Sequence, residues 1–254
     1  MKTLCKDDLH IKIFNTRSEM GTAAAKDFSA HVKKILETKD FLRIIFAAAP
    51  SQIEFLSAIA ADKTIEFNRF DAFHMDEYIG LEKDSPQSFG NFLQRHIFSL
   101  REFRSIRYID GQNSDPEAAC REYARFLTEK PIDIVCMGIG ENGHIAFNDP
   151  PTADFQDQKI VKVVELDETC RMQQVHDGCF PEIAAVPTHA ITLTIPTLTS
   201  AGTRFCVVPS ATKANAVKRM IQDPIHESCP CTILRRTKNS VGRSEERRVG
   251  KECR

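Results

Sequence analysis

One stretch of the chain, residues 133–151 (DIVCMGIGENGHIAFNDPP), limits the possible folds more than any other. An apolar run over 132–137 has the length and the β-branched content that are typical of a buried strand. The run ends in Gly138, Gly140 and Gly143, and a strand that ends in glycines places its backbone close to a ligand or to another strand. Ligands of open α/β sheets bind beyond the carboxyl ends of the strands, so we expect a functional site here.

Apolar runs typical of strands alternate with segments of helical periodicity along the whole chain. We expect strands at 43–47, 70–73, 105–109, 132–137, 159–165, 189–195, 204–208 and 232–235. Between them we expect helices at 18–37, with Ser18 as the N-cap, and at 53–59, 85–100, 116–127, 168–175 and 211–220. The alternation predicts an α/β fold: one doubly wound, Rossmann-like domain over 1–242, with a mostly parallel sheet and helices on both faces.

The composition argues against several classes of partner. Hydrophobic residues make up 42% and charged residues 27% of the chain, which is ordinary for a soluble globular enzyme, and the formal net charge is −1. No basic stripe with interleaved aromatic residues is present, so we expect no binding to nucleic acid. The apolar runs are too short to span a bilayer, so we expect no membrane contact and a cytoplasmic location. The sequence leaves the oligomeric state open, a homo-oligomer included.

The nine cysteines are irregularly spaced, which favours reduced thiols over a disulfide framework. Cys229 and Cys231 form a C-x-C pair, but no second pair of ligands lies at zinc spacing. We therefore expect no metal site.

The last residues of the chain, 243–254 (RSEERRVGKECR), are charge-dense and have neither helical nor strand periodicity. They look like the translation of a sequencing-library adapter, and we expect a non-native or disordered tail. In that case the natural chain is cut near Val241 or Gly242 and its closing segment is missing.

Two separated motifs resemble those of the glucosamine-6-phosphate deaminase and isomerase family, within the 6-phosphogluconolactonase-like superfamily. Residues 138–150 (GIGENGHIAFNDP) resemble the family's GxGxxGHIAFNEP-type loop, and residues 73–81 (FHMDEYIGL) resemble its upstream signature. The motifs occur in the expected order, and the resemblance extends weakly from about residue 19 to about residue 239. It implies an enzyme without a cofactor that acts on a small sugar phosphate.

Asp76 matches the family's base, which moves a proton between C2 and C1 of the sugar. The chemistry agrees, because a carboxylate at the carboxyl end of a strand, beside the like charge of Glu77, gains proton affinity. The other interpretation is a surface carboxylate that caps a turn or pairs with a lysine.

His144 matches the family's ring-opening acid and base, with Asn142 and Asp149 beside it. Imidazole titrates near neutral pH, so it can protonate a ring oxygen. A lone histidine is more often a structural donor, but the polar cluster here favours catalysis. Asn142 stands where the family often has aspartate, and Asp149 where it has glutamate. A catalytic group displaced by about an ångström can lose on the order of a hundredfold in rate.

The predicted phosphate site begins at Ser51, where a strand runs into a helix N-terminus that can bind phosphate. Ala49 and Pro50 replace glycines that are usual in the family at this loop, and Pro50 has no N–H. The glycine loop after the strand at 132–137, Gly140 included, is expected to lie against the substrate.

Three further side chains are candidates for binding phosphate. Lys213 matches the family's phosphate-binding lysine, and its other interpretation is a solvated helix residue. The family's arginine aligns approximately with His176, a weaker and pH-dependent substitute, while Arg171 lies close enough in sequence to replace it.

The resemblance implies isomerisation and deamination of glucosamine 6-phosphate to fructose 6-phosphate and ammonia. One alternative is action on another amino-sugar phosphate, such as galactosamine 6-phosphate. Another is a hydrolase of the 6-phosphogluconolactonase type. A third is a sugar-phosphate sensor without catalysis, for which Asn142, Asp149 and the missing arginine argue.

Overall fold

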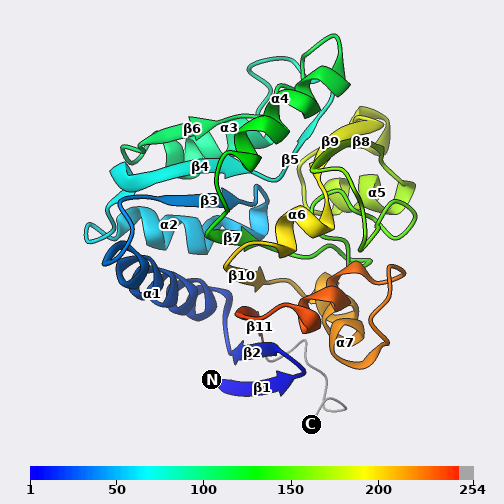
Figure 1. Cartoon of the computed structure of the whole chain (residues 1–254). Helices are drawn as coiled ribbons and strands as arrows, with labels where there is room; N and C mark the ends of the chain where they lie inside the picture. The colour runs from blue at the N-terminus through cyan, green and yellow to red at the C-terminus, as the bar shows by residue number, and fades with distance from the viewer. Residues whose placement is uncertain (246–254) are drawn as a thin grey trace.

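The structure, a computed structural model, describes residues 1–245 (Figure 1). The strands of its main sheet are β1 (Lys2–Lys6), β2 (Leu9–Phe14), β3 (Leu42–Phe46), β4 (Phe70–His74), β6 (Ser105–Arg107), β7 (Ile134–Met137), β10 (Thr203–Val208) and β11 (Ser240–Glu245). Their order is β1-β2-β11-β10-β7-β3-β4-β6, and every neighbouring pair is parallel except the β1–β2 hairpin. The predicted α/β class with a mostly parallel sheet is confirmed.

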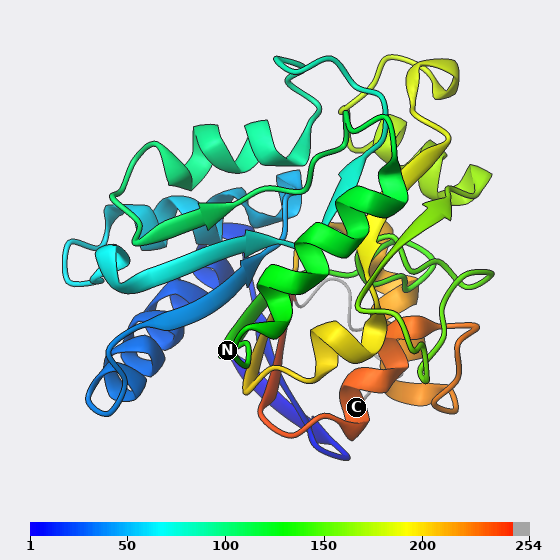
Figure 2. The same cartoon turned by 45° about the horizontal axis from the view of Figure 1, so that its top comes forward.

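Helices cover both faces of the main sheet because its central strands are apolar on both sides. The helices are α1 (Arg17–Leu36), α2 (Ile53–Ala61), α3 (Phe89–Leu93), α4 (Pro116–Thr128), α5 (Glu168–His176), α6 (Ile195–Thr199) and α7 (Ala214–Gln222). Successive residues of β3 alternate between two cores: Ile44 packs with α1 and α2, and Ile45 with α4 and α6. Figure 2 shows these two pairs of helices on opposite sides of the sheet.

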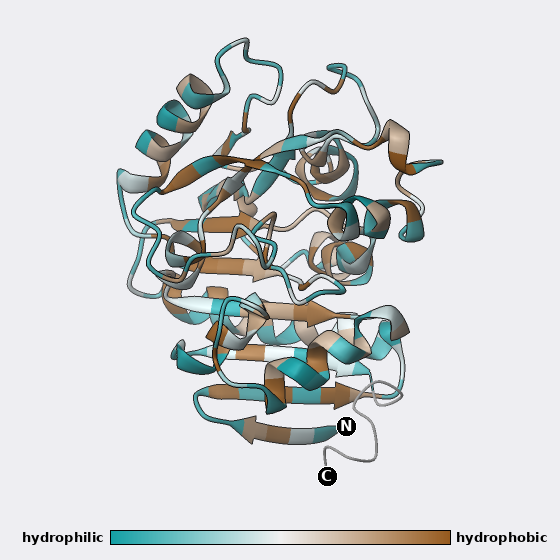
Figure 3. Ribbon diagram, turned by 90° about the vertical axis from the view of Figure 1, so that its right-hand side faces the viewer, coloured by the Kyte–Doolittle hydropathy of each residue, from teal (hydrophilic) through white to brown (hydrophobic). Residues whose placement is uncertain are grey.

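The hydropathy of the ribbon follows this layering. In Figure 3 the strands of the main sheet carry much of the brown, and the helices around them mix brown with teal. All residues of β3 and of β10 are buried. Strands buried on both faces carry apolar runs in the sequence, and the runs at 44–46 of β3 and 205–208 of β10 made these two predictable.

A second, smaller sheet was not predicted. It is antiparallel, with the order β5 (Asp76–Tyr78), β9 (His189–Leu193) and β8 (Val161–Glu165). It shares a third core with α5, built around Tyr78, Phe147 and Phe180. β5 is too short to have a readable period, so the sequence did not separate it from β4.

Two predicted local features are wrong. The strand expected at 232–235 is part of a 3-10 helix, Pro230–Arg236, which begins with a proline that fixes φ and donates no hydrogen bond. A short apolar run does not by itself distinguish a strand from a buried helical turn. The N-cap of α1 is Thr16 instead of Ser18, and its side chain accepts a hydrogen bond from the Glu19 N–H.

The end of the described chain also differs from the expected tail. Arg243, Ser244 and Glu245 complete β11, which pairs with β10 on one side and β2 on the other. The strand therefore extends beyond the predicted boundary at residue 242. The rest of the expected tail, 246–254, lies outside the described residues.

None of the helices within residues 1–245 combines the length and the apolar character needed to cross a membrane.

Candidate functional site

A cavity of about 400 Å³ opens where several parallel strands of the main sheet end. The loops after β3, β4, β7 and β10 line one side of it, and α3 and α5 contribute the other walls. Carboxyl ends of parallel strands meet at one edge of a sheet, so residues distant in sequence converge there. The lining brings together four of the predicted residues: Ser51, Asp76, His144 and Lys213.

Asp76 is the first residue of β5, and only 6% of its surface is exposed. Burial, and then the like charge of Glu77, raise the pKa of the Asp76 carboxyl well above its usual range. A carboxylate with raised proton affinity is a stronger base, which suits abstraction of a proton next to a carbonyl.

His144 is held by two side chains that lie behind it. Its Nδ1 is 2.9 Å from Asn142 Oδ1 and also 2.9 Å from Asp149 Oδ1. The Asn142 amide donates to the same Asp149 oxygen at 2.9 Å, which closes a three-membered network. Nδ1 therefore contacts the supporting side chains Asn142 and Asp149. Nε2 is the ring nitrogen that remains for a ligand.

Asp149 is 1% exposed, yet it remains acidic. Burial alone would raise the pKa of this carboxyl, but the charge of His144 and hydrogen bonds from His144, Asn142 and Cys170 outweigh burial and lower it. An ionised Asp149 stabilises a protonated imidazole, as the carboxylate of a catalytic triad does. The 2.9 Å contact shows that aspartate reaches His144 in spite of its shorter side chain.

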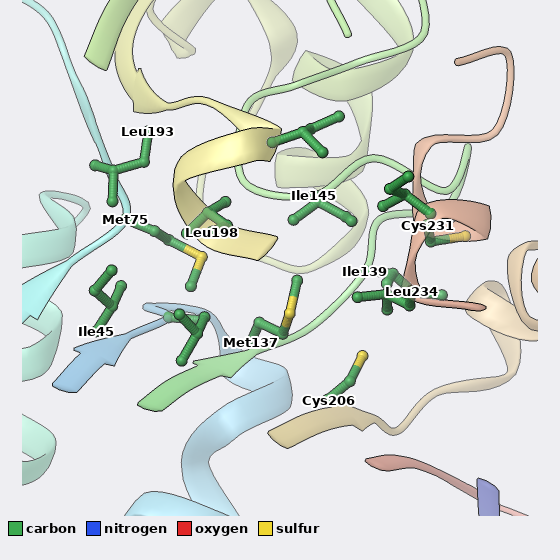
Figure 4. Packing of buried hydrophobic residues seen from close by; sticks show 14 of the residues in the cluster. Ile45, Met75, Met137, Ile139, Ile145, Leu193, Leu198, Cys206, Cys231 and Leu234 are labelled. Carbon is green, nitrogen blue, oxygen red and sulfur yellow. The ribbon is translucent and has the colours of Figure 1, made fainter. Parts of the chain in front are cut away.

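Gly140 has a role different from the predicted contact with the substrate. It is not among the cavity-lining residues, and a Cβ atom on it would lie 2.1–2.4 Å from three atoms of the His144 ring. The glycine therefore makes room for the imidazole. Its neighbour Ile139, with Ile145 on the far side of the loop, is anchored in the apolar cluster of Figure 4.

We expect Gly140→Ala to lower kcat by about a hundredfold, because the added methyl group displaces the His144 ring by roughly an ångström. Gly242→Ala is the matched control, since the nearest atoms to its Cβ lie at an ordinary 3.6 Å. Steady-state kinetics and thermal unfolding of both variants check this. An unchanged kcat in Gly140→Ala would show that the imidazole position is not critical.

Lys213 contributes a buried ammonium group to the cavity. Its side chain is 4% exposed, and its Nζ has no hydrogen-bond partner within residues 1–245. Burial lowers its pKa, and Asp177 and Glu141 oppose that effect from 3.7 and 3.9 Å. A buried cation without hydrogen bonds is costly in the free protein, so this group is well placed to receive an anion.

The structure does not bring Arg171 and His176 into the cavity, which corrects two predicted phosphate contacts. The Arg171 guanidinium donates to the carbonyls of Ile183 and Val186, at 2.8 and 3.0 Å, and lines a separate hollow. The His176 side chain is 53% exposed, and its Nδ1 lies 3.5 Å from Glu141 Oε2. Both side chains are on α5, and neither is among the residues that line the cavity.

Several lining residues were missed. They include Gln52 after β3, Gln173 and Gln174 of α5, and Asp177, the C-cap of that helix. The Gln52 amide donates to the Val207 carbonyl at 3.1 Å, while its Oε1 has no partner within the described chain. The available signal was the helical spacing of Gln173 and Asp177, which places two polar side chains on one face.

One group of side chains within residues 1–245 has metal-ligand character. The ligand atoms of His144, Asp149 and Cys170 lie within 4.8 Å of one another, and all three residues are buried. The His144 and Asp149 atoms already take part in the hydrogen bonds described above. We therefore assign this group to the support of His144 and not to an ion.

Comparison with known proteins gives the family of this chain. The family model described as glucosamine-6-phosphate isomerases/6-phosphogluconolactonase matches residues 15–242. The chain belongs to this family. Glucosamine-6-phosphate deaminases of Bacillus thuringiensis (strain Al Hakam) and Bacillus cereus (strain B4264) are each 31% identical to this glucosamine-6-phosphate isomerase/6-phosphogluconolactonase family member over 231 residues. The match covers 91% of this chain and 84% of each relative.

Solved structures of the family share the fold. A monomeric glucosamine-6-phosphate deaminase superposes with a TM-score of 0.84 at 25% identity, over 93% of this chain and 97% of the other. The 6-phosphogluconolactonase of Thermotoga maritima superposes with a TM-score of 0.76 at 20% identity, over 93% and 99% of the two chains. The second likeness concerns the fold alone.

Proposed function

We propose that this family member is a glucosamine-6-phosphate deaminase, which converts glucosamine 6-phosphate and water to fructose 6-phosphate and ammonia. The observation that carries the proposal is the convergence of Asp76, His144 and Lys213 on one cavity from three distant parts of the chain. The curated relatives that carry the deaminase name, at 31% identity, support it.

Ring opening is the first step, and we assign it to His144. The reaction moves a proton from the C1 hydroxyl to the ring oxygen. Near neutral pH an imidazole can accept a proton from the hydroxyl and donate a proton to the ring oxygen. Asn142 and Asp149 hold the ring through Nδ1, which directs Nε2 toward the sugar. The ionised Asp149 stabilises the imidazolium that forms in between.

Proton transfer is the second step, and we assign it to Asp76. The carboxylate takes the proton from C2 of the open-chain sugar, next to the C1 aldehyde, and returns it to C1. The amine-bearing C2 becomes an imine, which water hydrolyses to the ketone with release of ammonia. The raised pKa of Asp76 makes it a base strong enough to share this proton with carbon.

Lys213 and Ser51 bind the phosphate in this account. We expect Lys213→Ala to raise KM by about 10- to 100-fold with a smaller change in kcat, because a charge-assisted hydrogen bond contributes about 1.5–3 kcal/mol to binding. Lys63→Ala, at an exposed position away from the cavity, is the control. A KM unchanged in Lys213→Ala, measured by ammonia release, would place the phosphate elsewhere.

A second candidate substrate is another amino-sugar phosphate, such as galactosamine 6-phosphate. The observation that favours it is the wall formed by α5, where Gln173 and Gln174 line the cavity and no arginine of that helix reaches it.

A substrate panel tests the proposal. Glucosamine 6-phosphate, galactosamine 6-phosphate and 6-phosphogluconolactone are offered separately, and ammonia release and lactone hydrolysis are measured. We expect the highest kcat/KM for ammonia release from glucosamine 6-phosphate. Lactone hydrolysis without ammonia release, or calorimetric binding without any turnover, would contradict the proposal.

We further propose that the enzyme acts in the cytoplasm. Every cysteine within residues 1–245 is a free thiol, which fits a reducing compartment. Expression with a fluorescent fusion partner and fractionation of the cells check this location.

A further inference from the structure

Glu77 follows Asp76 on β5 but points away from the cavity. Successive side chains of a strand face opposite sides, so Asp76 lines the cavity while Glu77 borders a second hollow behind it. Glu77 is 5% exposed. Its carboxylate accepts four hydrogen bonds: from the N–H groups of Tyr78 (3.0 Å), Phe89 (3.0 Å) and Gly90 (2.9 Å), and from the Ser88 hydroxyl (2.8 Å). None of these donors carries a charge.

Two of the four donors are the first N–H groups of α3. An anion at this position satisfies N–H groups that have no partner inside the helix, and it interacts favourably with the helix dipole. The helical segment continues as a π-helical turn, Gln94–Phe98. This segment forms one wall of the cavity with four side chains: Phe89, Phe92, Arg95 and His96.

Close packing around the Glu77 side chain also restricts the contact between β5 and the start of α3. A Cβ atom on Gly90 would lie 3.4 Å from Glu77 Oε2, and one on Gly111 would lie 3.1 Å from Glu77 Cγ. The side chain is therefore packed between the start of α3 and the loop after β6. Its carboxylate has one position in which all four hydrogen bonds form.

We propose that Glu77 is a positioning residue that couples the catalytic base Asp76 to the wall of the cavity formed by α3, by fixing β5 against the start of that helix. The inference rests on the proposed function in one respect, the role of Asp76 as base. Glu77 touches no reacting atom. It sets the distance between the base and the wall, and its charge sets the electrostatic environment of the base.

The other ionisable groups around this pair do not offset the charge of Glu77. Burial lowers the pKa of His74, which accepts from the Ile109 N–H through Nε2 and so stays neutral. Burial raises the pKa of three further neighbours, Tyr78, Tyr123 and Cys170, which are neutral too. His144 and Lys213 line the same cavity as Asp76, and neither is among the groups that shift the Asp76 pKa.

The test replaces Glu77 by Gln, which keeps the shape and removes the charge. The NH₂ group of the glutamine is a donor and would face N–H and O–H donors, so some of the hydrogen bonds that hold the start of α3 are lost. We expect kcat to fall about 10- to 100-fold, because the base and the wall lose their fixed spacing. We also expect faster amide hydrogen exchange at residues 88–93. The acid limb of the kcat/KM profile should move to lower pH, since burial still raises the Asp76 pKa but the like charge of Glu77 no longer adds to it.

Two further variants separate geometry from charge. Ser88→Ala removes one donor to Glu77 and the N-cap of α3 but keeps the Glu77 charge, so exchange should rise without a shift of the pH profile. Glu82→Gln makes the same chemical change at an exposed position of the neighbouring loop. It should leave kcat, amide hydrogen exchange and the pH profile unchanged. If Glu77→Gln does not fold, Glu77→Asp keeps the charge and shortens the arm, and it should reproduce the Ser88→Ala pattern.

The outcomes distinguish this inference from the proposed function. Absence of ammonia release by the wild-type protein refutes the proposed function. Hydrogen exchange in the substrate-free protein still tests whether Glu77 holds the start of α3. Unchanged exchange in Glu77→Gln overturns the positioning role. A lower kcat with faster exchange but an unmoved pH profile overturns the electrostatic effect of Glu77 on Asp76 and leaves Glu77 with the positioning role alone.

Discussion

Asp76→Asn is expected to lower kcat for ammonia release by about 10²- to 10⁴-fold, the usual contribution of a general base. The asparagine has nearly the same shape but cannot accept a proton from carbon. Because the change is made on the cavity wall, substrate should still bind, so KM should change far less than kcat.

The same variant is expected to be more stable than the wild type at neutral pH. The pKa of Asp76 is raised in the folded state, so the folded protein binds this proton more tightly than the unfolded chain does. The stability that follows is fully present below the unfolded pKa of about 3.9 and is lost as the pH rises through the folded pKa. Asparagine has no such loss, so the free energy of unfolding of Asp76→Asn should increasingly exceed that of the wild type from pH 4 upward.

Denaturant titration at several pH values measures this difference, with Asp84→Asn as a control at an exposed position. An Asp76→Asn variant that keeps wild-type kcat would remove Asp76 from its assigned role. One that is less stable at neutral pH would show that the carboxylate is a structural partner and not a destabilised base.

His144→Gln is expected to lower kcat/KM for glucosamine 6-phosphate by about 10²- to 10⁴-fold as well. Glutamine can form hydrogen bonds but cannot exchange a proton with the ring oxygen near neutral pH. Ring opening then depends on the slow spontaneous reaction in the cavity.

This second variant should shift stability in the opposite direction. Burial would raise the pKa of Asp149, and the charge of His144 is the largest of the effects that lower it instead. A lowered folded pKa contributes stability above the unfolded value of about 3.9, and this contribution is lost as the pH falls through the folded pKa. Without His144 the contribution shrinks, so His144→Gln should be less stable than the wild type at neutral pH and closer to it in acid.

His10→Gln, on the exposed side of β2, is the control for both measurements. Equal stability of His144→Gln and the wild type across the pH range would contradict the interaction between His144 and Asp149. Full activity of His144→Gln would assign ring opening to another group.

Much of the main sheet was predictable because its central strands are buried on both faces. β7 is wholly apolar and β3 and β10 each end in an apolar run, and the glycines after β7 indicated where the sheet edge would bind a ligand. Asp76 follows β4 and His144 lies in the loop after β7, so their convergence at one edge of the sheet followed from the topology of parallel strands.

The parts that were not predictable depend on side-chain direction and on tertiary packing. The sequence places Arg171 and His176 near the cavity, but the helical phase of α5 directs Gln173, Gln174 and Asp177 toward it. Gly140 looked like a contact for substrate, whereas its missing Cβ serves the His144 ring. Such close approaches between two residues of one loop have no periodic signal in a sequence.

The central claim is that one sugar phosphate spans the cavity from Asp76 and His144 to Lys213. The most direct test is a crystal structure of the Asp76→Asn variant soaked with glucosamine 6-phosphate. The account predicts sugar C2 beside residue 76, the ring oxygen within about 3 Å of His144 Nε2, and the phosphate on Lys213 Nζ and Ser51 Oγ. A sugar bound in another hollow, or a phosphate at the Asp76 end of the cavity, would contradict it.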